Sequence, residues 1–452
     1  MHSPQERFRE IALALTVGVV LADSSIVTLG LPEILREFDG TVFGVSWVLT
    51  AFNLALALAI VPAVRFARTS SPQRGWGIGL VVFSIASLLC ASAESETVLI
   101  VFRVVQALGG ALLIACAIEL IARIRGSHEL AVPTWGAAGT IGVAVGPAAG
   151  GVLTELLSWQ AIFYVQMPLL LLLPLAFLRS PGPAEPGPEG IEDLRPEVAL
   201  GLLSAGLTAA LFLLVVLLTE GWALSPLAAA ATISAIPVAA YGARWLIDKA
   251  GPPLSAALAG GIAVTGGLAA LGVLPGASWA LTLQPQVLIG VGLALALPVL
   301  TIAAVGGHDP LGKRAAATIA ARHAGIVVGI IALAPVLSWQ LETQRERAQN
   351  SATALLLDSD VPTETKIDLG EQIAIQIDVA DGKLPKVGPA FDAVSTPAGD
   401  EGAYAQLEQD VQDQIERAAT SAFRLPFLGA AVFALLSLIP IARLRSGARE
   451  KA

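Results

Sequence analysis

Charged side chains are scarce in this sequence, and their scarcity excludes an ordinary soluble protein. Only 14% of the 452 residues are charged, whereas 55% are hydrophobic and the mean hydropathy is +0.73. In soluble globular domains about a quarter of the residues are charged. The composition therefore indicates a chain that lies largely within a lipid bilayer.

Cysteine and the short motifs of catalysis are also nearly or wholly missing. The two cysteines, Cys90 and Cys116, fall inside apolar stretches, which excludes a disulfide framework and a cysteine-based metal site. There is no phosphate-binding Gly-x-x-x-x-Gly-Lys-Ser/Thr loop, no His-Glu-x-x-His pair and no nucleophile elbow. We therefore expect no enzyme, no metal or other cofactor and no nucleic-acid partner, and an ion gradient as the energy source for any transport.

Long apolar stretches are what the sequence has in abundance. A helix needs about 20 apolar residues to cross a bilayer, and twelve stretches are close to that length. They are residues 11–31, 44–66, 75–93, 97–122, 130–154, 159–178, 197–219, 224–247, 252–274, 281–305, 314–340 and 424–446. The sequence thus predicts an all-α membrane protein with twelve spans.

The basic residues between the spans predict the orientation. If the N-terminus is cytoplasmic, the cytoplasmic segments carry 17 Lys and Arg residues, whereas the short outer loops carry only Arg36. Loops rich in Lys and Arg stay on the cytoplasmic side. We therefore expect a plasma-membrane protein with both termini in the cytoplasm.

Five segments follow from this layout. Residues 1–178 form a first six-helix bundle, 179–196 a Pro/Gly-rich cytoplasmic linker, and 197–340 spans 7–11 of a second bundle. Residues 341–423 form an extracellular insert with a net charge of -10, and 424–452 the last span and a cytoplasmic tail. Apolar residues of the insert recur every three or four positions after Asp400, which predicts a helix. The stretch from Thr365 to Ala380 is compatible with helix or strand, and we favour helix.

A cluster of small residues marks the fifth span. Gly142, Gly146 and Gly150 are four residues apart, so they share one helix face and allow another helix to approach closely. Pro147 frees one backbone carbonyl, which a neighbouring helix must satisfy. Together with Gly151, these residues suit a conformational hinge between moving helices; a tightly packed but static helix is the alternative.

The glycine cluster, with the stretch Trp159-Gln-Ala-Ile-Phe-Tyr-Val-Gln-Met-Pro168 that follows, resembles the antiporter motif of the major facilitator superfamily. The nearest branch is the drug:proton antiporters, most of which have 14 spans. That branch commonly has Arg at Gln160 and Asn at Gln166. The resemblance implies two six-helix bundles; we favour twelve spans, although Thr219 to Trp222 resembles the turn between the two extra spans.

Asp23 is the leading candidate for proton coupling. It lies in Leu21-Ala-Asp-Ser-Ser-Ile-Val-Thr-Leu-Gly-Leu-Pro32, which resembles the first-span motif of the same branch. Ionisable residues inside spans are costly and are functional candidates by default. A buried carboxyl group can take up and release a proton near neutral pH. The alternative is an aspartate that is merely capped by hydroxyls such as that of Ser24.

Arg103 is the second candidate. The stretch from Arg103 through Gln106 to Ala111 resembles the fourth-span motif of the branch, and this implies that Arg103 assists proton transfer by exchanging partners. A permanently charged guanidinium needs a counter-charge, for which Asp23 is the natural partner; a fixed structural pair is the alternative. Glu119, further along the same span, is a possible second proton site or a surface residue.

Further polar residues inside spans are candidates for the substrate cavity. Arg322 and His323 lie in a stretch that resembles the branch's Arg-Gln-x-Gly-x-x-x-Gly sequence, with His323 replacing the glutamine. His323 could titrate near neutral pH, but we favour a histidine that packs between helices. Asn53, Gln106 and Gln166 could line the cavity or bond to adjacent helices.

One inner loop resembles the superfamily's Gly-x-x-x-Asp-Arg-x-Gly motif. In Arg244-Trp-Leu-Ile-Asp-Lys-Ala-Gly251 the matching residues are Asp248, Lys249 and Gly251, which the resemblance implies act as an inner latch. The equivalent loop of the first half has Val64 and Arg68 where that motif has glycine and aspartate.

The function expected from these features is a monomeric, proton-driven antiporter that exports lipophilic or cationic small molecules. Three alternatives stay open. The chain could export a lipid or envelope component, it could take up a solute by symport, or it could be a sensor or scaffold that has lost transport.

Overall fold

The computed structural model describes residues 3–179, 182–185, 193–249, 251–274, 278–306, 311–359, 361–379, 387–394 and 401–444. These residues form helices and connecting turns, with no strand among them. Residues 180–181 and 186–192 of the Pro/Gly-rich linker and the tail beyond residue 444 lie outside the described residues. The all-helical prediction is confirmed, including helix at Thr363–Val379 in the insert.

The first half contains five long helices and one short, irregular segment. The long helices are α1 (Pro4–Glu37), α2 (Val42–Thr69), α3 (Pro72–Ala91), α4 (Glu96–Arg125) and α5 (His128–Leu156). Each begins after a Ser or Thr whose side chain accepts a hydrogen bond from a first-turn backbone N–H. Such caps satisfy donors that have no partner within the helix, so the polar residues between the spans set where each helix starts.

The sixth predicted span is not a regular α-helix. It consists of α6 (Ala161–Tyr164) followed by the 3-10 helix η1 (Met167–Phe177). Long 3-10 runs are uncommon, but Pro168 and Pro174 each lack the N–H that an α-helical hydrogen bond requires. Eleven helices of the described chain are long and apolar enough to span a membrane, and Ala161–Phe177 is a shorter apolar twelfth.

The second half repeats this plan with more interruptions. It contains α7 (Arg195–Val216), the π-helix η2 (Leu217–Gly221), α8 (Pro226–Ile233), α9 (Ala235–Ala243), the 3-10 helix η3 (Arg244–Lys249) and α10 (Pro253–Val273). After these come the 3-10 helix η4 (Trp279–Thr282), α11 (Leu283–Ala304), α12 (Leu311–Asp358) and α16 (Arg424–Ala442).

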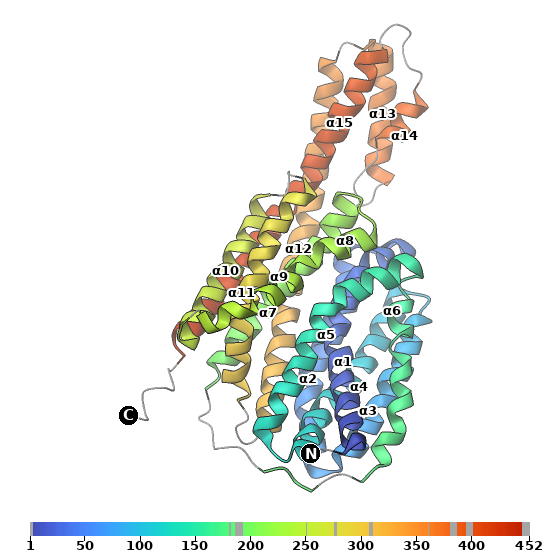
Figure 1. Cartoon of the computed structure of the whole chain (residues 1–452). Helices are drawn as coiled ribbons and strands as arrows, with labels where there is room; N and C mark the ends of the chain where they lie inside the picture. The colour runs from blue at the N-terminus through green and yellow to red at the C-terminus, as the bar shows by residue number, and fades with distance from the viewer. Residues whose placement is uncertain are drawn as a thin grey trace.

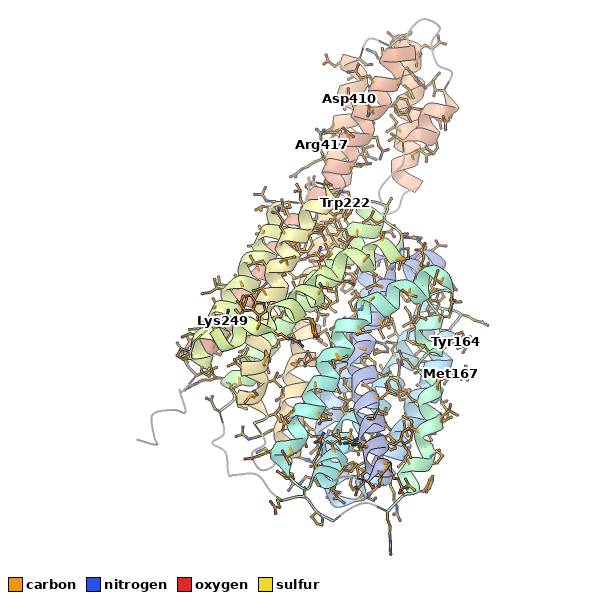
Figure 2. All side chains as sticks on the ribbon, in the orientation of Figure 1. Tyr164, Met167, Trp222, Lys249, Asp410 and Arg417 are labelled. Atoms are coloured by element: carbon orange, nitrogen blue, oxygen red, sulfur yellow. The ribbon has the colours of Figure 1, made fainter. Side chains whose placement is uncertain are left out.

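The insert stands beyond one end of the bundle (Figure 1). The 48-residue helix α12 leaves the bundle there, and α13 (Thr363–Val379) and α15 (Glu401–Ser421) pack on its extension. The short helix α14 (Gly388–Ala393) packs on α13. The insert has its own small apolar core, in which Phe391 meets Tyr404 edge to face. Asp410 and Arg417 lie on α15, beyond the bundle (Figure 2). We call the end of the bundle that carries the insert the insert end.

The two halves meet along two seams. On one, α2 packs against α12; on the other, α5 packs against α8. At the insert end, Arg36 forms an ion pair with Glu220 at 2.7 Å, and the carboxylate of Glu155 accepts from the Leu227 N–H at 3.3 Å. Both contacts join the first half to the second, so the halves are held together at the insert end.

Candidate functional site

The centre of the first half holds a fully buried ion pair. Asp23 on α1 and Arg103 on α4 have no exposed side-chain surface, and Nη1 of Arg103 lies 2.5 Å from Oδ2 of Asp23. The predicted partnership of these two residues is thereby confirmed. A single buried charge is very costly, and here each side chain supplies the counter-charge of the other.

Arg103 is held by further contacts on α2 and α4. Its Nε donates to the carbonyl oxygen of Val48 at 3.1 Å, and its Nη1 donates to Oε1 of Gln106 at 2.6 Å. The guanidinium carbon lies 4.1 Å from the centre of the Phe52 ring, a cation–π contact. Nη2 is buried without a hydrogen-bond partner in the described part of the chain. The guanidinium thus has a donor to spare if its partners change.

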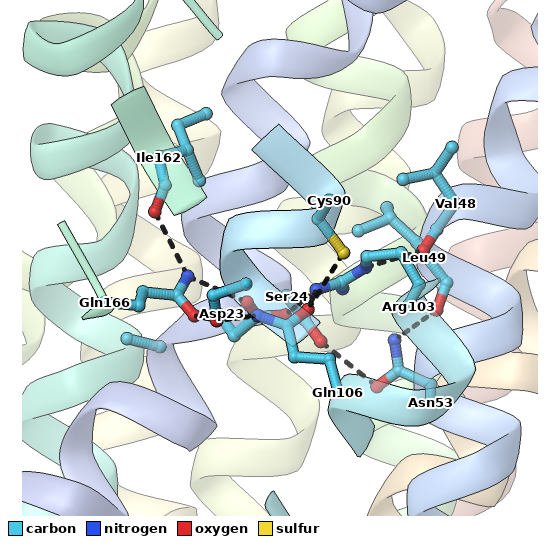
Figure 3. Close-up of polar contacts among 12 residues, drawn as sticks. Asp23, Ser24, Val48, Leu49, Asn53, Cys90, Arg103, Gln106, Ile162 and Gln166 are labelled. Carbon is cyan, nitrogen blue, oxygen red and sulfur yellow. Dashed lines mark hydrogen bonds and ion pairs between the residues drawn. The ribbon is translucent and has the colours of Figure 1, made fainter. Parts of the chain in front are cut away.

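Two glutamines extend the pair toward α3 and α6 (Figure 3). Gln166 donates to Oδ1 of Asp23 at 3.0 Å, and Gln106 donates to Oε1 of Gln166 at 2.8 Å and to the Ser87 hydroxyl at 2.9 Å. Both glutamines are buried, so in this conformation they orient the ion pair and are closed off from solvent. The drug:proton branch commonly has Asn at this position. The amide of Gln166, on a longer side chain, still reaches Asp23.

Asn53 links this centre to the second half of the chain. Its amide N–H donates to the Leu49 carbonyl oxygen, so its Oδ1 is free to accept. That oxygen accepts from the Ser24 hydroxyl at 3.2 Å and lies 2.6 Å from Nδ1 of His323 on α12. His323 must therefore carry a proton on Nδ1. His323 thus joins two helices, which agrees with the helix-packing role that we favour for it. Through Asn53, Ser24 also takes part in the contact between the halves, and Ser24 is the neighbour of Asp23.

The glycine cluster packs α5 against two partners. A Cβ at Gly142 would overlap the backbone of Gly18, and one at Gly150 would overlap the carbonyl oxygen of Ile26, so this face lies against α1. A Cβ at Gly151 would instead meet Ala230 and the carbonyl oxygen of Pro226, both on α8. The close helix approach that the spacing predicts is confirmed. The cluster contacts both the helix that carries Asp23 and the second half.

The carbonyl that Pro147 frees has found a partner. Proline at this position cannot donate to the carbonyl oxygen of Val143, four residues earlier. The Ser25 hydroxyl, on α1, donates to that oxygen at 3.3 Å and to the Ala22 carbonyl oxygen at 2.8 Å. The sequence required such a partner but did not identify Ser25. A hydroxyl inside the apolar first span, two residues after Asp23, was the available signal.

We expect Ser25→Ala to lower the free energy of unfolding by about 1 kcal/mol, because the carbonyl that Pro147 frees loses its donor. The same substitution in a Pro147→Ala background is expected to cost less, since the backbone N–H that alanine restores there can donate to Val143. Denaturant unfolding of wild type, the two single variants and the double variant in a nonionic detergent measures this coupling. Equal costs in both backgrounds would show that the Ser25 hydroxyl does not serve the freed carbonyl.

The structure does not bring the other predicted residues into this centre. Glu119 accepts from Nε of Arg123 at 3.1 Å, one helical turn away, and has no described hydrogen bond to the Asp23 network. The ammonium of Lys249 lies 4.4 Å from the centre of the Trp245 ring. Gly251 has a left-handed φ of 78°. The side chain of Asp248 lies outside the described residues. Arg322 lies next to His323 but has no described bond to the residues above.

A family model and several known proteins match parts of the chain. The Major Facilitator Superfamily model matches residues 13–337. The multidrug resistance protein Stp of Mycobacterium tuberculosis is 32% identical over 176 residues, which are 38% of this chain and 33% of Stp. The multidrug efflux pump LfrA of Mycolicibacterium smegmatis is 30% identical over 185 residues, 38% of this chain and 37% of LfrA. The matched stretch is thus only about a third of each relative.

Solved structures show the same fold over nearly the whole chain. A bacterial homologue of the human lysosomal transporter Spinster, in an inward-facing and unoccupied conformation, aligns with a TM-score of 0.64 and 15% identity. The alignment covers 98% of both chains. A D-xylose–proton symporter aligns with a TM-score of 0.57 and 14% identity over 72% of this chain and 89% of its own. The chain belongs to the Major Facilitator Superfamily of membrane transporters.

Proposed function

We propose that this transporter is a proton-driven antiporter that exports lipophilic small molecules from the cytoplasm. The observation that carries the proposal is the buried pair of Asp23 and Arg103, a carboxylate and a guanidinium that meet inside the described spans. The name of LfrA, a multidrug efflux pump, supports export by a relative of this chain. The branch resemblance also suggests cationic substrates.

The proposed coupling rests on competition for Arg103. When Asp23 takes up a proton, its attraction for Arg103 falls, and the guanidinium can turn toward other acceptors around it. Asp23 and Ser24 are consecutive on α1, and the Ser24 hydroxyl shares the Asn53 oxygen with His323. A shift of α1 on protonation would therefore disturb the contact between the halves. Protons then favour one conformation and substrate the other, each by its difference in affinity.

The proposed orientation places the insert outside the cell and both termini in the cytoplasm. The basic residues of the short loops support it. The contacts of Arg36 with Glu220 and of Glu155 with α8 then close the outer side. We propose that these contacts separate during export, and that the glycine cluster, which touches both α1 and α8, is the hinge. The Asp248 loop stays a proposed latch on the inner side.

Gradient-driven dye movement tests the proposal. Purified protein is reconstituted in liposomes, and a pH gradient of either direction is imposed with dye in the external medium. Two dyes without titratable groups are used, the cation ethidium and a neutral lipophilic dye, because neither is trapped by the gradient alone. We expect at least one of them to accumulate only in acid-interior vesicles that contain protein, since protons leaving the vesicle drive the dye inward. Accumulation with an alkaline interior would instead establish symport, and movement indifferent to pH would remove the proton from the mechanism.

A further inference from the structure

Arg322 points into the protein and not toward lipid. Residues one turn away on its face of α12, Ile319 and Ile326, are buried, whereas Val328 and Ile331 on the opposite face are exposed. Its neighbour His323 contacts α2 of the first half. Gly325, also on α12, packs directly against the backbone of Gly201 on α7. Arg322 lies between these two directions, and its side chain is partly accessible. It therefore lies on the face of α12 between the contacts with α2 and with α7.

No charge in the described chain balances this guanidinium. Arg322 takes part in no described hydrogen bond or ion pair. Asp23 is already paired with Arg103, Glu119 with Arg123 and Glu10 with Arg125. A permanently charged side chain at membrane depth is costly unless a partner or water compensates it. The second half of the transporter thus presents, among its described residues, an uncompensated positive charge to the interior.

We propose that Arg322 binds the acidic group of the transported molecule. This rests on the proposed export function and makes amphiphiles with a carboxylate, sulfonate or phosphate group and an apolar body its preferred substrates. The guanidinium is suited to such groups, because its planar fork of donors matches two acceptor oxygens at once. Ile319 and Ile326, one turn away on either side along α12, are buried apolar neighbours. A cationic substrate would meet repulsion at the same place.

Three pyrene probes that differ only in their head group test the charge. Binding of 1-pyrenebutyrate, 1-pyrenebutanol and 4-(1-pyrenyl)butylammonium is followed by energy transfer from the protein's eight tryptophans, with full-length protein in a nonionic detergent. We expect the butyrate to bind most tightly. Arg322→Gln is expected to weaken its binding about tenfold to a hundredfold, the range for hydrogen bonds to a charged group, and to leave pyrenebutanol unchanged.

Further arms identify the source of the acidic group and guard against misfolding. Competition by dioctanoyl phosphatidate but not by benzoate would indicate an acidic lipid, and the reverse a small acid. Arg322→Lys keeps the charge but loses the fork, so we expect a smaller loss; it carries the test if Arg322→Gln does not elute as a folded species. Butyrate binding that is absent in wild type, unchanged in both variants, or displaced equally by chloride would overturn the proposal.

The result of the probe-binding test can be separated from the result of the proton-coupling test. The binding assay uses no gradient, so it measures the Arg322 site without proton-driven movement. A transporter that binds the probe through Arg322 but shows no gradient-driven flux would retain the Arg322 site and lose the antiport mechanism. One that couples to protons but binds the butylammonium best would retain antiport and lose the acidic substrate.

Discussion

Arg103→Leu is expected to abolish gradient-driven transport and to destabilise the protein by about 3–5 kcal/mol, the cost of leaving one partner of a buried pair uncompensated. Asp23 has no exposed surface, and Arg103 is the cation it contacts in the described part of the chain. Without Arg103 it must either stay charged in a low-dielectric interior or hold a proton permanently. Either outcome stops it from cycling. Denaturant unfolding and flux in proteoliposomes measure the two effects.

The double variant Asp23→Asn/Arg103→Leu separates stability from coupling. It removes both charges, so we expect it to recover much of the stability that Arg103→Leu loses, because replacing a whole buried pair is often nearly neutral. Its flux is expected to stay absent. Arg103→Lys retains the charge but cannot reach Val48 and Gln106 together, and we expect an intermediate stability. An Arg103→Leu protein as stable and as active as wild type would show that the pair is incidental.

Gly142→Val is expected to eliminate transport by forcing α1 and α5 apart. A Cβ at this position overlaps backbone atoms of Gly18, which cannot rotate away as a side chain could. Overpacking of a close contact typically costs about 1–3 kcal/mol, and here it also displaces the helix that carries Asp23. We expect a lower unfolding temperature and flux at the level of protein-free vesicles.

Gly136→Val is the matched control on the same helix. A Cβ at Gly136 has no atom within 4 Å, and the substitution adds the same β-branched side chain to the same helix. We expect folding and flux near those of wild type. Equal losses in the two variants would show that valine in α5 is harmful for reasons unrelated to the contact with α1.

Local patterns predicted the contact of Asp23 with Arg103 but not the other connections within the site. Asp23 and Arg103 each stand out because an ionisable residue within an apolar run is rare, and opposite charges suggested their contact. The glycine spacing predicted a close approach by another helix. It could not identify α1 as that helix, since spacing describes one face and contains no information on what covers it.

Contacts between distant segments were the main omission. Asn53 and His323 are 270 positions apart, and neither the polarity of an amide nor that of an imidazole identifies its partner. The sixth span was predicted as a regular helix because hydropathy counts apolar side chains and ignores backbone donors. Pro168 and Pro174 remove two of those donors, and the chain there takes the 3-10 form.

The most direct test of the central claim is dye accumulation in acid-interior proteoliposomes, compared between wild type and Asp23→Asn with the dye that wild type carries best. Asparagine preserves the size of the side chain and its hydrogen bond with Gln166, but it cannot take up a proton. We predict gradient-driven accumulation in wild type and none in Asp23→Asn, with the variant still folded by size exclusion. Undiminished gradient-driven accumulation in Asp23→Asn would contradict the account and transfer the proton to another group.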